Sequence, residues 1–461
     1  MIVRLALRSL ATRPVRTALL ACGFGFGIAV MAALLGVGEV ILEQAHSPAL
    51  QGGGDVVIRS QVGALDNARA LMTGVLRAPD LARRIVGVSP STRHTVYVMT
   101  DKGAIAAMAR SSIPSLERAV DDPEVKTVTG WTDGPADGEW SAPQADAVLR
   151  SIDRFHPIPD VPDFQSSWAE WLYFNGRTLD GRVRFYLTFL VGPASSTPGR
   201  RSAGVRLQVE RDGRTTSYAA GGEVDEAAVL DRAPDLDVAG NHVRLDGLTY
   251  RIALALPGAT GEIALEAAPG HSLLPATIRG ARGWVTGYVA PALSATVRGS
   301  LLLDHERVVI ENAAGYHDHN WGFWEGVRWQ WGQVAHDDVS LVYGRVFPPA
   351  SVADPDRMPG FLGVLGAAGP LGFSTTVSIQ EGGGDATSRR TVIRAKGAAM
   401  DLEVVFTAER LERTTMSKGP AIGGAGLDFL QLGGEYRVTG HVGDRPINFT
   451  ARGAAETFER K

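Results

Sequence analysis

The sequence predicts a mainly β protein, in which two consecutive barrel-like domains follow an N-terminal transmembrane helix and a mixed α/β connecting region. From about residue 156, apolar and polar residues alternate over short runs that end at Gly, Asp or Asn, as in strands joined by turns. Glycine accounts for 55 of the 461 residues, above the usual share of about 7%. The roughly 300 residues with this pattern exceed one eight-stranded barrel, and no strand–helix–strand alternation predicts a parallel sheet.

The N-terminus has the pattern of a membrane anchor. Four arginines and no acidic residue lie in 1–16, and 17–38 is a run of 22 residues without a charge. A helix of that length spans about 33 Å, enough for the bilayer core. The positive-inside rule predicts a cytoplasmic tip at 1–16, a single transmembrane helix at 17–41 in the cytoplasmic (inner) membrane, and the remaining chain outside the cytoplasm. A cleaved signal peptide and lipidation at Cys22 are the alternatives.

Overall composition excludes several classes of protein. The net charge of -4 gives no basic surface for nucleic acid. The single cysteine, Cys22, excludes an intramolecular disulfide framework and a cysteine-based metal cluster. We expect no cofactor.

The connecting region, 42–155, is expected to be a structural spacer or a small packing domain without a chemical site. Helical spacing occurs at 64–75 and 79–85, and a β-like run lies at 95–99. Residues 141–144 fit a capping box ahead of a further helix. Two barrel domains are then expected at 156–332 and 333–461. Their clearest strand-like runs are 182–191, 202–210, 242–254, 261–267, 296–303, 339–346, 373–379 and 436–442.

Tryptophans mark a candidate site, since seven of the nine lie between residues 168 and 331. They are interleaved with titratable residues in two stretches, 168–176 and 315–332. Burying polar groups among aromatic rings is unfavourable unless those groups are paired or used. The two stretches are therefore expected to form one functional site.

Strand periodicity divides each stretch between two faces of a sheet. In the second stretch, Tyr316, Asp318 and Asn320 share one face, and His317, His319 and Trp321 share the other. In the first stretch, Trp171, Tyr173 and Asn175 lie opposite Glu170. If the face with Asp318 is the barrel interior, burial raises the pKa of that carboxyl, which then serves as an acid near neutral pH.

Other chemistries remain open at this point. His317, His319 and His336 with a carboxylate would make a metal site, although no clear fourth ligand stands nearby. A glycosidase would need two carboxylates, and Glu170 and Asp318 are the candidates if they face one another. A serine hydrolase is disfavoured because no Gly-x-Ser-x-Gly elbow occurs.

The first 58 residues resemble the first transmembrane helix of MacB/FtsX-type permeases of ABC exporters. The resemblance rests on LALRSLATRPVRTALLACGFGFGIAVMAALLGVGEVILEQ followed by GGGDVVI. It implies a link to an exporter as partner, but no transport activity, because the chain has no later transmembrane helices and no Walker A sequence.

The aromatic stretches resemble the hydroxyneurosporene synthase (carotenoid hydratase) family and its AttH-type relatives. The matching motifs are EWLYFNG, GYHDHNWG and RWQWGQVAHDDVSLVYGRV. The resemblance implies two lipocalin-like barrels with a ligand cavity at or near their junction, and a catalytic pair at Tyr316 and Asp318. The family's upstream His-x-Trp element is absent; the chain has GWVTGYVAP at 283–291 instead, where Tyr288 is expected to take the aromatic role.

Together these features predict a membrane-anchored hydratase or cyclase that protonates an alkene in an isoprenoid (carotenoid-like) or other long apolar substrate. Asp318 is the expected acid, and Tyr316 or Asn320 the group that orients water. Substrate contacts are expected from Trp171, Tyr173, Asn175, Tyr288, Asn320, Trp321, Trp329 and Trp331. We expect Glu170, His317 and His319 to support these residues without contacting the substrate. The alternative is a non-catalytic lipid-binding accessory protein of an ABC exporter.

Overall fold

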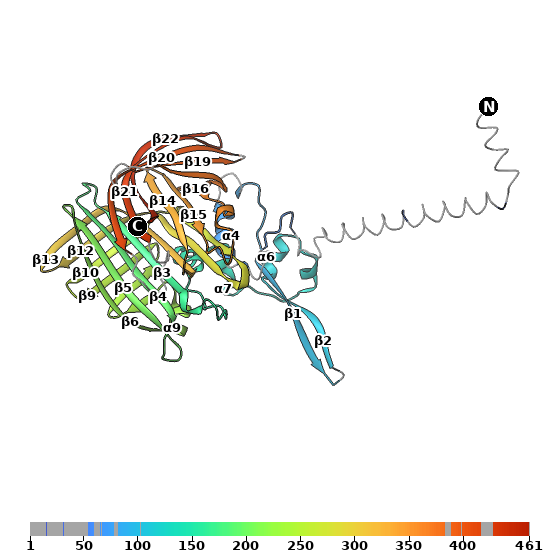
Figure 1. Cartoon of the computed structure of the whole chain (residues 1–461). Helices are drawn as coiled ribbons and strands as arrows, with labels where there is room; N and C mark the ends of the chain where they lie inside the picture. Colours follow the sequence, from blue (N-terminus) through green and yellow to red (C-terminus); the bar gives the residue numbers. More distant parts are fainter. Residues whose placement is uncertain are drawn as a thin grey trace, which may run out of the picture. The chain divides into compact units, whose positions relative to one another are not determined.

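The computed structural model describes residues 54–59, 67–77, 82–101, 103–382, 389–397, 399–415 and 427–460, with the single residues Val15, Met31 and Leu65. Figure 1 traces the chain. Two units emerge from the contacts: one contains residues 85–138, and the other contains 66–84 and 139–461. The expected tip at 1–16 and transmembrane segment at 17–41 lie outside the described residues, except for Val15 and Met31. No helix among the described residues is long and apolar enough to cross a membrane.

The first unit is built around a hairpin. Strand β1 (Ser91–Thr100) pairs antiparallel with β2 (Gly103–Ser112), which confirms the strand predicted at 95–99. Helix α6 (Pro114–Ala119) and the 3-10 helix η1 (Pro123–Thr127) follow. The guanidinium of Arg110 forms ion pairs with carboxylates of this following segment and so connects the hairpin to it.

Two helices precede the sheets of the second unit. Helix α4 (Ala68–Arg77) overlaps the expected helix at 64–75, and it packs against α8 (Ala145–Ile152). The capping box predicted at 141–144 is wrong: Ser141 ends α7 (Pro135–Ser141), and Gln144 is the N-cap residue without a side-chain hydrogen bond. The apolar face of α8 is nevertheless buried against the first sheet. The expected helix at 79–85 lies partly outside the described residues.

The second unit is mainly β, with two nearly closed antiparallel sheets that form two lipocalin-like barrels. The first sheet has eleven strands within the described residues, in the order β6-β5-β4-β3-β13-β12-β10-β9-β8-β7, with β11 paired to β12. They are β3 (Trp168–Arg177), β4 (Val183–Ala194), β5 (Arg200–Arg211), β6 (Arg214–Asp225), β7 (Leu236–Val238), β8 (Asn241–Asp246), β9 (Thr249–Leu256), β10 (Ala259–Ala267), β11 (Leu273–Arg279), β12 (Val285–Leu303) and β13 (Glu306–Phe323). The short helix α9 (Glu226–Arg232) follows β6.

The second sheet has nine strands within the described part of the chain, in the order β17-β16-β15-β14-β22-β21-β20-β19-β18. They are β14 (Arg328–His336), β15 (Val339–Phe347), β16 (Phe361–Gly366), β17 (Gly369–Ser374), β18 (Thr376–Gly382), β19 (Arg390–Gly397), β20 (Met400–Thr415), β21 (Leu427–Val442) and β22 (Arg445–Arg460). The short 3-10 helices are η2 (Gln165–Ser167), η3 (Ala281–Gly283) and η4 (Pro355–Arg357).

Each predicted strand run corresponds to observed strands, with two differences. The run at 242–254 is two strands, β8 and β9, because Gly247 adopts a φ of 59° and turns the chain. The run at 373–379 is likewise divided between β17 and β18. The alternation of apolar and polar residues predicted the extended segments, but it did not predict the tight turns within them.

Three apolar clusters hold the second unit together. One fills the first sheet and includes Leu172, Phe174 and Phe189; another fills the second sheet and includes Phe406 and Tyr436. The third lies between the sheets, and its members are Tyr173, Ala290, Leu293, Tyr316, Trp331, Val342 and Leu365. Polar contacts also cross this junction, such as Arg410 with Glu210 at 2.5 Å. The two sheets are therefore joined by direct apolar and ionic contacts, and the candidate site lies beside these contacts.

Candidate active site

A cavity of about 890 Å³ lies between the two sheets. This volume is near the upper end of the usual range of roughly 300–1,000 Å³ for small-molecule pockets. The first sheet contributes Trp171, Tyr173, Tyr186, Tyr288, Asp318 and Asn320 to its wall, and the second contributes Trp329, Trp331, Phe361, Phe429, Gln431 and Glu456. The wall is mostly apolar and aromatic, with a few polar groups.

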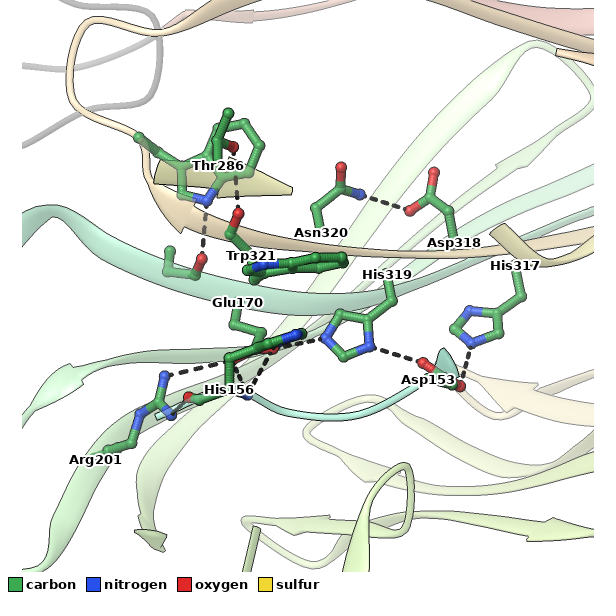
Figure 2. Close-up of polar contacts among 12 residues, drawn as sticks. Asp153, His156, Glu170, Arg201, Thr286, His317, Asp318, His319, Asn320 and Trp321 are labelled. Carbon is green, nitrogen blue, oxygen red and sulfur yellow. Dashed lines mark hydrogen bonds and ion pairs between the residues drawn. The ribbon is translucent and has the colours of Figure 1, made fainter. Parts of the chain in front are cut away.

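The position of this cavity corrects one expectation about the barrel interior. The two faces predicted for 316–321 are observed, but the face with Asp318 points out of the first sheet and toward the second. The interior of the first sheet is filled by side chains such as Leu172, Phe174 and Phe189. Figure 2 shows Asp318 and Asn320 on one side of β13 and His317 and His319 on the other. Alternation separates two faces, but it does not identify the one that faces a barrel core.

The Asp318 carboxyl is the central polar group of the cavity wall. Its side chain is 5% exposed. The Tyr316 hydroxyl donates a hydrogen bond of 2.8 Å to Oδ2, and Asn320 Nδ2 donates one of 2.8 Å to Oδ1. Burial and the nearby Glu456 carboxyl raise the pKa of Asp318 well above its usual value, and they outweigh the opposing hydrogen bond from Tyr316.

A chain of hydrogen bonds holds this carboxyl from behind. Trp331 Nε1 donates to the Tyr288 hydroxyl at 3.1 Å, and the Tyr288 and Tyr316 hydroxyls are 2.8 Å apart. Because Tyr316 gives its single proton to Asp318, Tyr288 donates to Tyr316. Burial raises the pKa of both phenols well above the usual value, so both stay neutral. Three strands, β12, β13 and β14, thus fix the direction of one carboxyl.

Aromatic rings surround the rest of the cavity. The rings of Trp171 and Trp324 are 4.6 Å apart, and those of Trp324 and Trp329 are 5.8 Å apart. Trp329 also contacts Phe458 at 4.8 Å. Trp171, Tyr173, Tyr288, Asn320, Trp329 and Trp331 all line the cavity, whereas Tyr316 and Asn175 are buried behind its wall.

Trp321 does not line the cavity, contrary to its expected role in substrate contact. Its indole lies on the opposite face of β13 and stacks on the His156 ring at 4.2 Å. Glu170 is on that face too, because it pairs with Trp321 across β3 and β13 while Asp318 pairs with Tyr173. Glu170 and Asp318 therefore do not face one another, and a two-carboxylate glycosidase arrangement is absent at this pair.

The buried face carries a chain of alternating acidic and basic groups. Asp153 contacts His317 Nε2 at 3.0 Å and His319 Nδ1 at 2.7 Å. Glu170 contacts His319 Nε2 at 3.1 Å and His156 Nδ1 at 2.7 Å. Burial lowers the pKa of His319, but its bonds to two carboxylates outweigh burial and raise that pKa to about 9. The same histidines help to hold the pKa of Asp153 below its usual value in spite of burial.

The histidines do not form the metal site considered from the sequence. His317 and His319 are committed to carboxylates and to the Tyr173 carbonyl, while His336 lies on β14 and stacks on Phe449 at 5.0 Å. Among the described residues, no group of three or more His, Cys, Asp or Glu is arranged to hold a metal ion.

Sequence reasoning missed the acidic group Glu456 on β22, as well as other polar lining residues such as Tyr186 and Gln431. The Glu456 carboxylate lines the cavity opposite the first sheet and accepts a hydrogen bond of 3.0 Å from Trp329 Nε1. Burial raises the pKa of Glu456 to about 7. The signal was local: Glu456 alternates with Ala454 and Phe458 on an otherwise apolar face, but no tryptophan accompanies it.

Comparison with known proteins gives no family assignment. No family model and no curated protein matches the chain, so the resemblance of residues 1–58 to exporter permeases has no support there. Among solved structures, an AttH-like protein from Nitrosomonas europaea is 16% identical, with a TM-score of 0.42, and the match covers 71% of this chain and 97% of that one.

Two further solved structures are similar to the same extent. Kievitone hydratase from Nectria haematococca is 14% identical, with a TM-score of 0.42 over 66% of this chain and 94% of that one. CghA with Sch210972 is 13% identical, with a TM-score of 0.42 over 67% of this chain and 95% of that one. At this level of similarity the activity of this chain has to be argued from its own site.

Proposed function

We propose that the protein is a hydratase- or cyclase-type enzyme that protonates an alkene in an isoprenoid or another long apolar substrate. One observation carries the proposal: the Asp318 carboxyl lies in the wall of a large aromatic cavity, with each oxygen bound by a neutral donor. A carboxyl with a raised pKa keeps its proton near neutral pH and serves as a general acid.

The cavity wall suits the cation that protonation of an alkene creates. Indole and phenol faces attract cations by about 2 kcal/mol or more each when water is excluded. Trp171, Trp329 and Trp331 supply such faces around the cavity. A tertiary carbocation formed beside Asp318 is stabilised there until water adds, a second double bond attacks, or a proton leaves.

The hydrogen-bond chain behind Asp318 supports the same role. A carboxylic acid transfers its proton efficiently only when its direction is fixed. Tyr316 and Asn320 fix both oxygens without supplying a positive charge. These neutral donors hold the carboxyl in place, and although their hydrogen bonds lower its pKa, burial and Glu456 raise that pKa by more.

Membrane attachment fits this proposal, because an apolar substrate concentrates in the bilayer. We propose that residues 17–41 anchor the protein in the inner membrane with its barrels outside the cytoplasm. The second candidate function is a non-catalytic hydrophobe carrier that works with an ABC exporter. The apolar cavity supports both, and the buried Asp318 favours the enzyme.

Deuterium exchange tests the enzyme. The full chain, purified in detergent, is incubated in D₂O with farnesol, geranylgeraniol or squalene, and products are analysed by mass spectrometry. We expect deuterium in the alkene and in a product that has gained one water. Asp318→Asn should lower both by at least about 100-fold, because removal of a general acid typically has this effect.

Asp337→Asn is the matched control, since Asp337 lies in an exposed turn and its side chain is 83% exposed. It should exchange at the wild-type rate. A wild-type protein that retains the hydrophobe but never incorporates deuterium would contradict the enzyme and favour the carrier.

A further inference from the structure

We propose that Glu456 is a second catalytic residue of this site: it accepts the proton of the water that adds to the carbocation. The inference rests on the proposed function and extends it, because it makes hydration the main outcome of the reaction. In this proposal both sheets contribute to the catalytic centre: the acid lies on β13 and the base on β22.

The position of Glu456 follows from its strand. Ala455 and Thr457 on either side of it are buried in the second sheet. Side chains alternate along a strand, so Glu456 points the other way, into the cavity that Asp318 also lines. The wall of the cavity therefore carries one carboxyl from each sheet.

Hydrogen bonds also hold the Glu456 carboxyl in place. Trp329 Nε1 donates to Oε2 at 3.0 Å, and the Gln431 side chain is a further hydrogen-bond partner. The register of β22 and β14, with Glu456 opposite Trp331, fixes the backbone beneath it. No lysine or arginine is paired with Glu456 in any ion pair among the described residues.

The electrostatics divide the two carboxyls between two roles. Each lies in an apolar wall, and the negative charge of Glu456 adds to burial in raising the pKa of Asp318. Glu456 itself has a pKa of about 7. The raised pKa of Asp318 favours its protonated form, while about half of the Glu456 carboxyls are ionised at pH 7. Environments that separate the pKa values of two nearby acids assign one as acid and the other as base.

The groups that are hydrogen-bonded around Asp318 cannot take the proton from water. The Tyr316 hydroxyl is buried behind the wall and gives its proton to Asp318. The Asn320 amide is not basic, and its nitrogen is bound to Asp318. Tyr288 is a neutral phenol already engaged with Tyr316 and Trp331. Two carboxylates remain as acceptors: Glu456, with a pKa of about 7, and the Asp318 carboxylate that the first step leaves. Unchanged hydration in Glu456→Gln would assign the proton to Asp318.

The reaction balances with these two groups and one water. The alkene π pair forms a C–H bond with the Asp318 proton as the O–H bond breaks, which leaves a tertiary cation and an Asp318 carboxylate. A lone pair of water forms the C–O bond, and one water proton moves to Glu456. The product is the alkene plus H₂O. The proton then passes from Glu456 through solvent to Asp318, which restores the starting state.

Product partitioning in D₂O tests this division of roles with geranylgeraniol as the probe. In Glu456→Gln, Asp318 still protonates the alkene, so deuterium exchange into the recovered alkene should persist within a few fold. Hydration should fall by about 100-fold or more. Glu435→Gln, an exposed position on the neighbouring β21, is the control and should hydrate normally. Circular dichroism confirms that each variant is folded.

Two outcomes of that experiment overturn the inference: unchanged hydration in Glu456→Gln, or equal loss of exchange and hydration. Absence of exchange in the wild type would instead contradict the proposed function.

A binding measurement tests Glu456 without turnover. N,N-dimethyltetradecylamine is an apolar chain with a cationic end that mimics the carbocation. Its affinity for the wild type should rise about tenfold between pH 6 and pH 8, as Glu456 ionises. Glu456→Gln should abolish this rise and Asp318→Asn should keep it. A rise that survives in Glu456→Gln assigns the charge to another group and overturns the inference.

Discussion

Asp318 depends on a few neighbours for its chemistry. Burial and Glu456 raise its pKa, and the Tyr316 hydrogen bond opposes them. The tyrosine therefore positions the carboxyl and at the same time limits how high its pKa rises. These two effects of one hydroxyl can be separated by experiment.

Tyr316→Phe removes that hydroxyl and keeps the ring. The pKa of Asp318 should rise further, so the alkaline limb of the kcat/KM profile should move to higher pH. The rate at neutral pH should fall about fivefold, as expected for loss of a hydrogen bond worth about 1 kcal/mol. Tyr288→Phe, one bond further from Asp318, should give a smaller shift in the same direction. A limb that moves to lower pH would show that Tyr316 does not act on Asp318 in this way.

Strand β13 separates two kinds of chemistry by its alternation. One face carries the proton donor of the cavity, and the other carries His317 and His319 within the ionic chain that includes Asp153 and Glu170. Asp153 and His156 precede the first strand of this sheet. Their ionic contacts therefore connect the segment after α8 to β13. This face contributes to stability and does not touch the cavity.

His319→Gln should change how stability depends on pH. The pKa of His319 is raised from about 6.5 in the unfolded chain to about 9 in the folded protein. The folded state therefore holds an extra proton between these values. The contribution of His319 is fully present below about pH 6.5 and is lost as pH rises toward 9.

Chemical denaturation followed by tryptophan fluorescence measures this effect. The free energy of unfolding of the wild type should fall by a few kcal/mol between pH 6.5 and 9, and His319→Gln should be less stable with a flatter profile. His336→Gln, a half-exposed histidine on β14, should keep the wild-type slope. Equal slopes in the wild type and His319→Gln would refute the assignment.

At the scale of the whole molecule, the site needs both sheets in place. Arg410 on β20 and Glu210 on β5 form an ion pair across the junction, and Glu210 is only 16% exposed. The cavity and its two carboxyls lie along the same junction. Contacts at its edge should therefore influence affinity without touching a ligand.

A charge swap tests this influence. Arg410→Glu places two carboxylates together and should weaken binding of N,N-dimethyltetradecylamine several-fold. Adding Glu210→Arg should restore binding, because the pair is rebuilt in reverse. Glu210→Arg alone should weaken binding as Arg410→Glu does. Failure of the double variant to recover would show that the ion pair does not hold the junction.

Much of this arrangement could be predicted from the sequence. Alternation and turn residues predicted the fold class, and the tryptophan stretches contain Asp318, Tyr316 and several aromatic residues of the cavity wall. The location of the cavity could not be predicted from alternation, because His317, His319 and Glu170 are more polar than a barrel core is expected to be. They are buried because Asp153 and His156 neutralise them, and this pairing between distant segments leaves no trace in local periodicity. Glu456 is a single acid on an otherwise apolar strand face; it was missed because no tryptophan accompanies it and its hydrogen-bond partner, Trp329, is far away in the chain.

The outward direction of Asp318 has a consequence for how such a protein changes over time. On β13, Asp318 and Asn320 line the cavity, whereas His317, His319 and Trp321 face the packed interior. Substitutions at the first set can alter what is bound or transformed while the second set preserves folding. Within a few residues of a single strand, positions that can contact a ligand alternate with positions that stabilise the fold.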